Sequence, residues 1–364
     1  MKRRTFLQGA LALTVGSRLD AGFDHHKLKA AGEILARAAT NGEIESSALY
    51  VRQGKHVFSD VYGKAGRQDA MFLLASISKT ISIAAVMSLF DEGHFQLDDP
   101  AQKYLPEFRG DGREKITMRQ LMTHVSGLPD QLPENARLRA AHAPLSAFVS
   151  AAIKTPLLFQ PGTRYSYSSM AILLATEVAQ RISGRTIAEL AQQRVYAPLN
   201  MTRSAMGLGK FQRSDMVMNQ VERAAPESGA GDPSTKSWDW NSKYWRELGA
   251  PWGTAHGSAE DVATFLHEFL HPTEKILKTE TIKMMISNQN PPGLRPRGLG
   301  FDLGQIGSTP GLSDGTFGHT GSTGTICWAD PQTDSICVVL TTLPYRAVKP
   351  HPRDFVAKAV AESI

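Results

Sequence analysis

Strand patterns at both ends of the chain bracket a helical middle, and this order constrains the fold most. SALYVRQGKHVFSDVYG (47–63) alternates as two strands that turn at Gln53-Gly54. Strand patterns return near the C-terminus in GLGFDLG (298–304), GTICWAD (324–330) and SICVVLTTL (335–343). The arrangement predicts an α/β (α+β) fold in which the two ends of the chain close one sheet, with a mostly helical domain inserted and a cleft between them.

The 364 residues, 41% hydrophobic, suffice for a large core in one or two closely packed domains. We assign 22–75 and 251–364 to the sheet domain and 76–250 to the helical domain. Residues 24–41 read as an amphipathic helix, and SISKTISIAAVMSLFDEG (76–93) predicts a strongly apolar helix that ends at Gly93. A last helix is expected in PRDFVAKAVAES (352–363).

Residues 1–21 resemble an export signal. Arg3-Arg4 precedes Phe6-Leu7 and a short apolar run, a pattern typical of twin-arginine signals. The run is far shorter than the roughly 20 apolar residues of a membrane-spanning helix. We therefore expect an exported, periplasmic protein with no membrane span; a frayed basic terminus is the alternative.

The net charge of +5 does not indicate a nucleic-acid partner. Residues 1–21 hold four basic residues and one acidic residue, which gives +3 and leaves +2 for the rest of the chain. No later run of basic residues interleaved with aromatics suggests a nucleic-acid groove. We expect a small-molecule ester, amide or peptide as the partner.

The apolar helix begins with a serine and a lysine that can act together. LLASISKT (73–80) places Ser76 and Lys79 three residues apart, and i and i+3 side chains are neighbours on a helix. A lysine in a dry cleft can accept the proton that a serine loses when it attacks a carbonyl. About one S-x-x-K match is expected by chance in a chain this long, and an ordinary cap with a surface lysine is the alternative.

Two distant segments support the catalytic interpretation. PGTRYSYSS (161–169) places Tyr167 after a proline–glycine turn and before an apolar helix, and FGHTGSTGT (317–325) is a glycine-spaced strand. S-I-S-K, Y-S-S and H-T-G in this order resemble the serine β-lactamase and penicillin-binding-protein superfamily, in its class C β-lactamase, esterase and D-aminopeptidase branch. The resemblance covers roughly residues 25–345 and implies a β-lactamase-like antiparallel sheet flanked by helices.

The resemblance also implies roles for single residues. Ser76 would be the acylated nucleophile, and Lys79 with Tyr167 would move its proton; Tyr165 is the competing tyrosine. The backbone N–H groups of Ser76 and Ser322 would form the oxyanion hole. Gly321 would let a substrate backbone approach the strand closely. No metal and no organic cofactor is implied, and His124 in THVSGLP is expected to be structural.

Two positions depart from the β-lactamase pattern. Ser169 stands where the family usually has Asn, and it offers fewer hydrogen-bonding groups for gripping a β-lactam. His319 stands where the third motif usually has Lys, so a fixed cation is replaced by an imidazole that is mostly neutral at pH 7. Both changes argue against an efficient β-lactamase. His319 could assist proton transfer or contact the substrate, and contact is favoured.

HEFLH (267–271) fits the zinc-protease pattern H-E-x-x-H letter for letter. At 100° per residue, however, His267 and His271 fall outside the apolar stripe of their helix, and Pro272 follows at once. A zinc helix turns its histidines inward, so we interpret this segment as a solvated helix face.

Two further features stay open or minor. SWDWNSKYWRELGAPWG (237–253) holds an aromatic cluster that could line the cleft or cover the seam between domains. Cys327 and Cys337 flank a predicted hairpin, and we interpret them as ordinary buried thiols because opposed strand residues lie at or beyond the disulfide span.

The sequence predicts an exported serine hydrolase that cleaves an ester or amide through an acyl-enzyme on Ser76, with esterase or D-aminopeptidase-like specificity. The alternatives are a D-alanyl carboxypeptidase, a weak β-lactamase, or a catalytically silent protein that binds a peptide in the same cleft.

Overall fold

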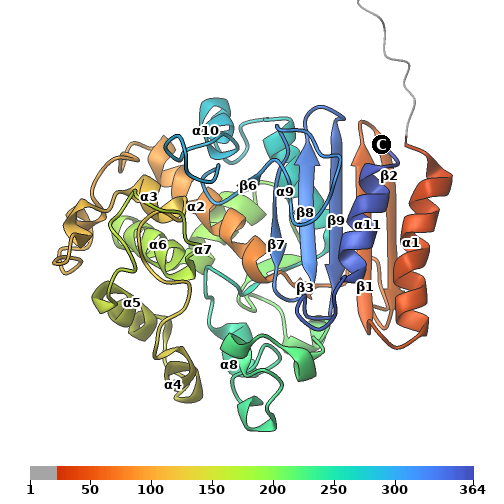
Figure 1. Cartoon of the computed structure of the whole chain (residues 1–364), viewed down its shortest axis with the longest axis horizontal. Helices are drawn as coiled ribbons and strands as arrows, with labels where there is room; N and C mark the ends of the chain where they lie inside the picture. Colours follow the sequence, from red (N-terminus) through yellow and green to blue (C-terminus); the bar gives the residue numbers. More distant parts are fainter. Residues whose placement is uncertain (1–22) are drawn as a thin grey trace, which may run out of the picture.

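A computed structural model describes residues 23–364, and one large antiparallel sheet organises them (Figure 1). The strand order is β2-β1-β9-β8-β7-β6, so strands from both ends of the chain lie side by side. The strands are β1 Ser46–Gln53, β2 His56–Gly63, β6 Asp302–Leu303, β7 Phe317–Gly321, β8 Thr325–Asp330 and β9 Ser335–Thr341. The predicted leader, residues 1–21, lies outside the described residues.

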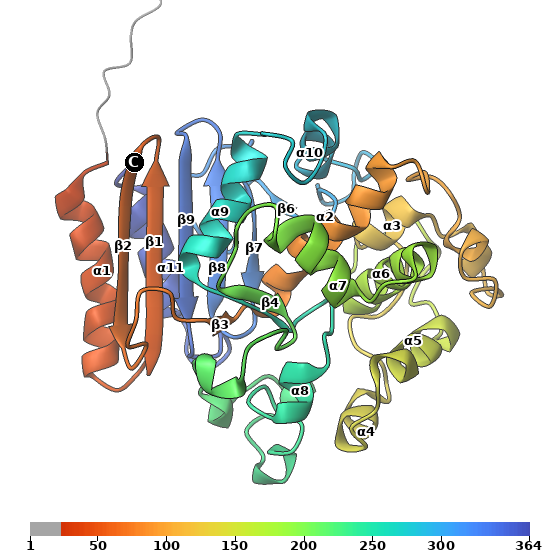
Figure 2. The same ribbon diagram turned by 180° about the vertical axis from the view of Figure 1, so that it is seen from behind.

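Helices cover both faces of this sheet. Figure 1 shows α1 (His25–Thr40) and α11 (Pro352–Ala361) on one face, and Figure 2 shows α9 (Ala259–Leu270) on the other. The strand residues alternate between the two faces because side chains of a strand point to opposite sides. Leu49 and Val339 pack on the α1 and α11 side, whereas Ala48 and Val338 belong to the core shared with the helical middle. The predicted antiparallel sheet flanked by helices is confirmed.

The helical middle lies beside the β7 and β6 edge of the sheet (Figures 1 and 2). Its helices and those that follow it are α2 Ser78–Asp91, α3 Met118–Met122, α4 Asn135–Ala140, α5 Leu145–Lys154, α6 Ser169–Ser183, α7 Ile187–Ala191, α8 Lys243–Glu247 and α10 Thr279–Met285. A second, three-stranded sheet has the order β3-β5-β4, with bounds β3 Phe72–Leu73, β4 Ser204–Met206 and β5 Ala255–Gly257. Strand β4 therefore lies inside residues 76–250, and the domain division proposed from the sequence stays a prediction.

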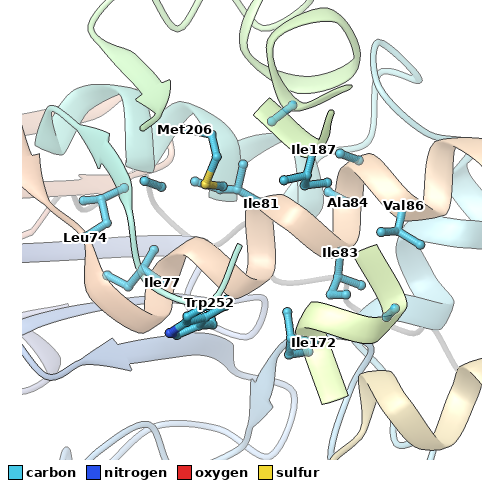
Figure 3. Close-up of a cluster of buried hydrophobic side chains, with 14 of the residues drawn as sticks. Leu74, Ile77, Ile81, Ile83, Ala84, Val86, Ile172, Ile187, Met206 and Trp252 are labelled. Atoms are coloured by element: carbon cyan, nitrogen blue, oxygen red, sulfur yellow. The ribbon is translucent and has the colours of Figure 1, made fainter. Parts of the chain in front are cut away.

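Helix α2 is the centre of the molecule. All its residues from Ser78 to Leu89 are buried, and Ile81 and Ile83 on different sides of it meet neighbours from other elements (Figure 3). A helix that is apolar all round is stable only when it is surrounded, which is why this segment carries the core. It ends at Asp91, and Gly93 follows with φ +81°, as the glycine stop predicted.

The two cysteines are free and buried, and they lie on opposite faces of the sheet. Cys327 is in register with Val338 and Cys337 with Trp328, so the two positions are offset by one residue. Their side chains consequently point away from each other, which confirms two ordinary thiols. Within residues 23–364, no helix is long and apolar enough to cross a bilayer.

Candidate active site

Ser76 lies in a tight turn that delivers the chain from β3 into α2. It occupies a 3₁₀ turn, Ala75–Ile77, immediately before the α-helix, so the residue precedes the helix proper. Ala75 has φ +48°, a left-handed conformation that costs about 1–3 kcal/mol in a non-glycine residue. Such strain persists only where the surroundings hold it, and here it presents the Ser76 hydroxyl at the positive end of α2.

Lys79 contacts Ser76 directly from within the core. Its Nζ donates hydrogen bonds to Ser76 Oγ at 2.9 Å and to the carbonyl oxygen of Trp252 at 3.0 Å. The side chain has no exposed surface, and this burial lowers the pKa of Lys79 to about 7. Asp130 acts against this shift, whereas the positive charge of Arg297 adds to it. The Lys79 amine is thus available to take a proton near neutral pH.

Tyr167 lies close to the same amine. The Lys79 Nζ lies 4.8 Å from the centre of the Tyr167 ring. Burial raises the pKa of Tyr167 well above its ordinary value, while Arg297 and the nearby Ser76 hydroxyl act in the opposite direction. The phenol is therefore protonated at neutral pH and can donate its hydrogen. Tyr165 does not border the cavity at Ser76, whereas Tyr167 does.

His124 positions the loop that carries Tyr167. It is fully buried, its ring centre lies 4.5 Å from that of Tyr167, and its Nδ1 accepts a hydrogen bond from the Ser168 N–H at 3.2 Å. Burial lowers the pKa of His124 well below its usual value, so the ring is neutral. The geometry agrees with the structural role expected from the sequence.

Ser169 is held by a carboxylate that the sequence analysis did not select. Its hydroxyl and its N–H both donate to Asp130 Oδ1, at 2.6 and 2.9 Å. Asp130 also borders the cavity beside Ser76. Because the Ser169 hydroxyl is committed to Asp130, it does not replace the two donors and the acceptor of an asparagine side chain.

His319 does not face the cavity. It is 2% exposed; its Nδ1 donates to the Thr320 carbonyl at 2.7 Å, which leaves Nε2 to accept from Arg297 Nη2 at 2.9 Å. Burial lowers the pKa of His319 to about 3, so the ring is neutral. With both ring nitrogens engaged, His319 orients Arg297, and this disagrees with the expected substrate contact.

Arg297 and Asp302 form a buried ion pair behind the site. The Arg297 guanidinium contacts the Asp302 carboxylate, and its central carbon lies 5.8 Å from the Tyr167 ring centre. This charge holds the pKa of the Asp302 carboxyl below its usual range despite burial. The structure therefore keeps a cation near the third motif, but in the core and paired, where no substrate carboxylate meets it.

The turn after β7 is bound tightly to the Ser76 turn. The hydroxyl of Thr323 donates to the Leu73 carbonyl at 2.8 Å, and that of Thr325 donates to the Leu74 carbonyl at 3.0 Å. A Cβ on Gly321 would lie 2.6 Å from the Leu74 oxygen. Gly321 is therefore needed for the chain's own close approach, and its expected role beside a substrate stays a prediction. Ser322, next in sequence, borders the cavity.

A cavity of about 160 Å³ opens at Ser76. It brings together four of the predicted site residues, Ser76, Tyr167, Ser169 and Ser322, whereas Lys79, His319 and Gly321 lie behind its wall. Three residues of the aromatic cluster line it: Trp240, Trp245 and Trp252. Tyr244 instead stacks on His142 at 4.9 Å between ring centres. Only part of the aromatic cluster therefore lines the cavity.

HEFLH is not the wholly solvated helix face that we expected. Glu268 is 3% exposed, and its carboxylate accepts from the Thr273 N–H at 3.1 Å and from the Lys275 N–H at 3.2 Å. Pro272 turns the chain back, and this brings the two N–H groups over Glu268. His271 pairs with Asp334 instead, Nε2 to Oδ1 at 2.6 Å. Within residues 23–364, no three His, Cys, Asp or Glu side chains converge to hold a metal ion.

Comparisons with known proteins show the family of the chain. A family model described as Beta-lactamase matches residues 33–362. A protein of Escherichia coli (strain K12) named "Putative D-alanyl-D-alanine carboxypeptidase" is 24% identical over 92% of this chain and 87% of its own length. Esterase EstB of Burkholderia gladioli is 34% identical over 52% of this chain and 51% of its own length.

A solved structure extends the likeness to the whole fold. A penicillin-binding protein homologue from Caulobacter crescentus superposes with a TM-score of 0.73 at 20% identity, over 94% of this chain and 99% of that one. At this level of identity the likeness shows the fold alone. Since the family model spans most of the sequence, the protein belongs to the β-lactamase family, a family of serine hydrolases.

Proposed function

We propose that the protein hydrolyses a small ester or amide through an acyl-enzyme on Ser76. The observation that carries this proposal is the 2.9 Å hydrogen-bonding distance between Lys79 Nζ and Ser76 Oγ, together with burial that lowers the pKa of this amine to about 7. A neutral lysine takes the hydroxyl proton as Oγ bonds to the substrate carbonyl.

The surrounding groups support the later steps. Ser76 and Ser322 border the cavity, and their N–H groups would donate to the oxygen that becomes negative, a contribution of about 10²–10³-fold in rate for each donor. The Tyr167 phenol, protonated and beside the amine, would pass a proton to the departing alcohol or amine and would regain one from the Lys79 ammonium, which makes the amine neutral again. A water molecule, deprotonated by the same amine, would then release the acid and restore Ser76.

Esterase specificity fits the site better than β-lactamase activity. Ser169 is committed to Asp130, and the neutral His319 is committed to Arg297. The cavity therefore lacks both the amide-gripping side chain and the free cation of the usual β-lactamase motifs. EstB of Burkholderia gladioli carries the name of an esterase, which supports the same choice. D-alanyl carboxypeptidase activity is the second candidate. The Escherichia coli relative has this activity in its name, and the match covers 87% of its length.

A fluorophosphonate probe tests the proposal. The wild-type protein should be labelled once and should hydrolyse p-nitrophenyl acetate, and Ser76→Ala should abolish both while the thermal transition is kept. Ser78→Ala is the matched control, since Ser78 is buried and its hydroxyl bonds the Ala255 N–H. Labelling that survives Ser76→Ala would contradict the proposal, and absence of labelling in folded wild-type protein would favour a silent binding protein.

Substrate class is tested by parallel assays of p-nitrophenyl esters, D-alanine anilide, a D-alanyl-D-alanine peptide and a chromogenic cephalosporin. We expect kcat/KM to be highest for an ester. Turnover of the cephalosporin far above every ester would overturn this ranking. We also propose export through the leader at residues 1–21; fractionation of cells expressing the full chain, compared with Arg3→Lys and Arg4→Lys together, tests it. Equal periplasmic amounts of both proteins would refute export by this route.

A further inference from the structure

Arg139 is a buried cation at the end of the cavity that opens at Ser76. It lies on α4, is 1% exposed, and borders the cavity together with Trp245. The central carbon of the guanidinium lies 3.8 Å from the Trp245 ring centre, so the charged plane rests on the indole. Nothing in the proposed acylation uses this residue.

The hydrogen bonds of Arg139 are few and go to neutral groups. Its Nε donates to Asn135 Oδ1 at 3.2 Å, and its Nη1 donates to Ser228 Oγ at 3.4 Å. Within residues 23–364, its Nη2 has no hydrogen bond and no carboxylate comes within 4.0 Å of the guanidinium. Burial lowers the pKa of Arg139 to about 10, which leaves it charged at neutral pH. A buried charge without a counter-ion is costly, and an anionic ligand would supply one.

Other buried arginines of the described chain bond carboxylates or backbone carbonyls, as Arg246 does with the carbonyls of Trp240 and Val217, although single nitrogens of Arg113, Arg246 and Arg297 have no partner. Arg297 pairs with Asp302, and Arg353 donates to the carbonyls of Gly321 and Thr325 at 2.8 and 2.6 Å. Arg113 pairs with Asp111 and donates to the Thr155 carbonyl at 2.6 Å. Arg139 differs from them because it borders the cavity and bonds only the side chains of Asn135 and Ser228.

We propose that Arg139 binds a carboxylate of the substrate, so that the preferred substrates are small esters or amides that carry a carboxylate close to the bond that is cleaved. The inference rests on the proposed function. A carboxylate fits because it accepts two parallel N–H bonds from one guanidinium, and a neutral acyl group would leave the charge unpaired.

The cavity limits the size of such a substrate. Its volume of about 160 Å³ is well below the roughly 300–1,000 Å³ of a pocket for a drug-sized ligand. A short dicarboxylic half-ester, such as a glutarate, suits that space, whereas a long fatty acyl chain does not. Arg346 also borders the cavity and is exposed, and it adds a second positive charge where the substrate enters.

Two carboxylates act against an anion. Asp130 borders the cavity, but its Oδ1 is already bonded by Ser169. Glu227 also borders it and interacts electrostatically with Arg139 from more than 4.0 Å away. Replacing Glu227 by Gln should therefore lower KM for an anionic substrate. This is the opposite of the effect expected for Arg139→Met.

The experiment compares mono-p-nitrophenyl glutarate with its methyl ester, which has a similar shape and no charge. In the wild type we expect the acid to have the lower KM. Arg139→Met keeps the stem on Trp245 but removes the charge, and it should raise KM for the acid about 10- to 100-fold, the worth of a charge-assisted hydrogen bond. It should leave kcat/KM of the methyl ester within about threefold, and Arg139→Lys should recover part of the loss.

Controls separate binding from folding and place the carboxylate. Arg113→Met removes a buried guanidinium away from the cavity and should not change the preference for the acid. 4-Carboxyphenyl acetate and its methyl ester carry the carboxylate, or its neutral counterpart, on the leaving group instead of the acyl group. If Arg139→Met removes the KM difference between acid and methyl ester in only one of the two pairs, that pair shows whether Arg139 binds the acyl side or the leaving-group side. Calorimetric titration of monomethyl glutarate into Ser76→Ala protein, with and without Arg139→Met, measures binding without hydrolysis.

Three outcomes decide the matter. An equal loss for acid and methyl ester would make Arg139 a support for α4 only and would overturn the inference. A preference for D-alanine anilide over both glutarates would assign the site to a cationic substrate and would overturn it as well. Hydrolysis of the neutral ester with no binding of monomethyl glutarate would refute the carboxylate site and leave the proposed function intact.

Discussion

Replacing Lys79 by Met should abolish hydrolysis and change how stability depends on pH. Lys79 is fully buried and its pKa falls from 10.5 to about 7 on folding. Between these two values the unfolded chain holds a proton on this amine that the folded chain has released. Folding is therefore opposed by the cost of deprotonation, and the cost shrinks as pH rises.

The magnitude follows from the size of the pKa difference. Each unit is worth about 1.4 kcal/mol, so the buried amine costs the native state about 4 kcal/mol at pH 7 and about 2 kcal/mol at pH 9. Met at this position does not titrate and fills a similar space. It loses the hydrogen bond to the Trp252 carbonyl, which costs about 1–3 kcal/mol at every pH.

Urea unfolding of both proteins at pH 7 and pH 9 measures the effect. We expect Lys79→Met to be the more stable protein at pH 7, by up to about 3 kcal/mol, and to lose about 2 kcal/mol of its advantage by pH 9. Groups that titrate in the same way in both proteins contribute equally to the two free energies of unfolding, so they cancel when one is subtracted from the other. An advantage that does not change with pH, or hydrolysis that survives the substitution, would refute the idea of a neutral, buried base.

Three further changes probe the same site. The kcat/KM of the wild type should rise with pH through about 7 as Lys79 loses its proton, and Arg297→Gln should move this limb to higher pH because the Arg297 charge lowers the pKa of Lys79; a limb that does not move would contradict that cause. Tyr167→Phe should lower kcat about 10²–10⁴-fold with little effect on KM, as stopped-flow acylation would show, and an unchanged acylation rate would exclude the phenol from proton transfer. Gly321→Ala would place a Cβ 2.6 Å from the Leu74 oxygen, so it should cost about 1–3 kcal/mol in thermal unfolding and slow acylation; wild-type values for both would show that this approach is relaxed easily.

Local spacing predicted the contact between two residues that are close in sequence. Ser76 and Lys79 are one helical turn apart, so their meeting needed no knowledge of the rest of the molecule. The sheet was predicted from the strand patterns at the two ends of the chain, because apolar strands that cannot stay exposed must pair with other strands. Tyr167 was reached only through the resemblance, since nothing in its local sequence points towards Ser76.

The groups that tune the site could not be predicted, because each acts from a distant segment. Asp130 meets Ser169, and Arg297 meets His319, only after folding brings separate loops together. Arg139 follows the same rule: its pattern is that of a charged residue on a short helix, and only its burial gives it meaning. Neither composition nor periodicity predicts that an arginine will be buried.

Pattern and structure also disagreed where the chain touches itself. The spacing of HEFLH placed His267 and His271 on a polar face and predicted a solvated segment, but polar atoms of the next loop cover Glu268 within it. The glycine of the third motif was interpreted as room for a substrate, and the structure adds that its Cβ position is occupied by the chain itself, at Thr325 Oγ1 and the Leu74 carbonyl. Sequence patterns predict which face of an element avoids water better than they predict what will cover it.

Pairing of the first strand with the last has a consequence for biosynthesis. The N–H of Ser46 donates to the hydroxyl of Thr342, which is 296 residues further along the chain. While the ribosome is still adding residues, β1 has only β2 beside it, and the turn that carries Ser322 does not yet exist. Substrate turnover is therefore expected only after the C-terminal strands have been made. A chain that stops before β9 would leave the edge of β1 unpaired and would be inactive.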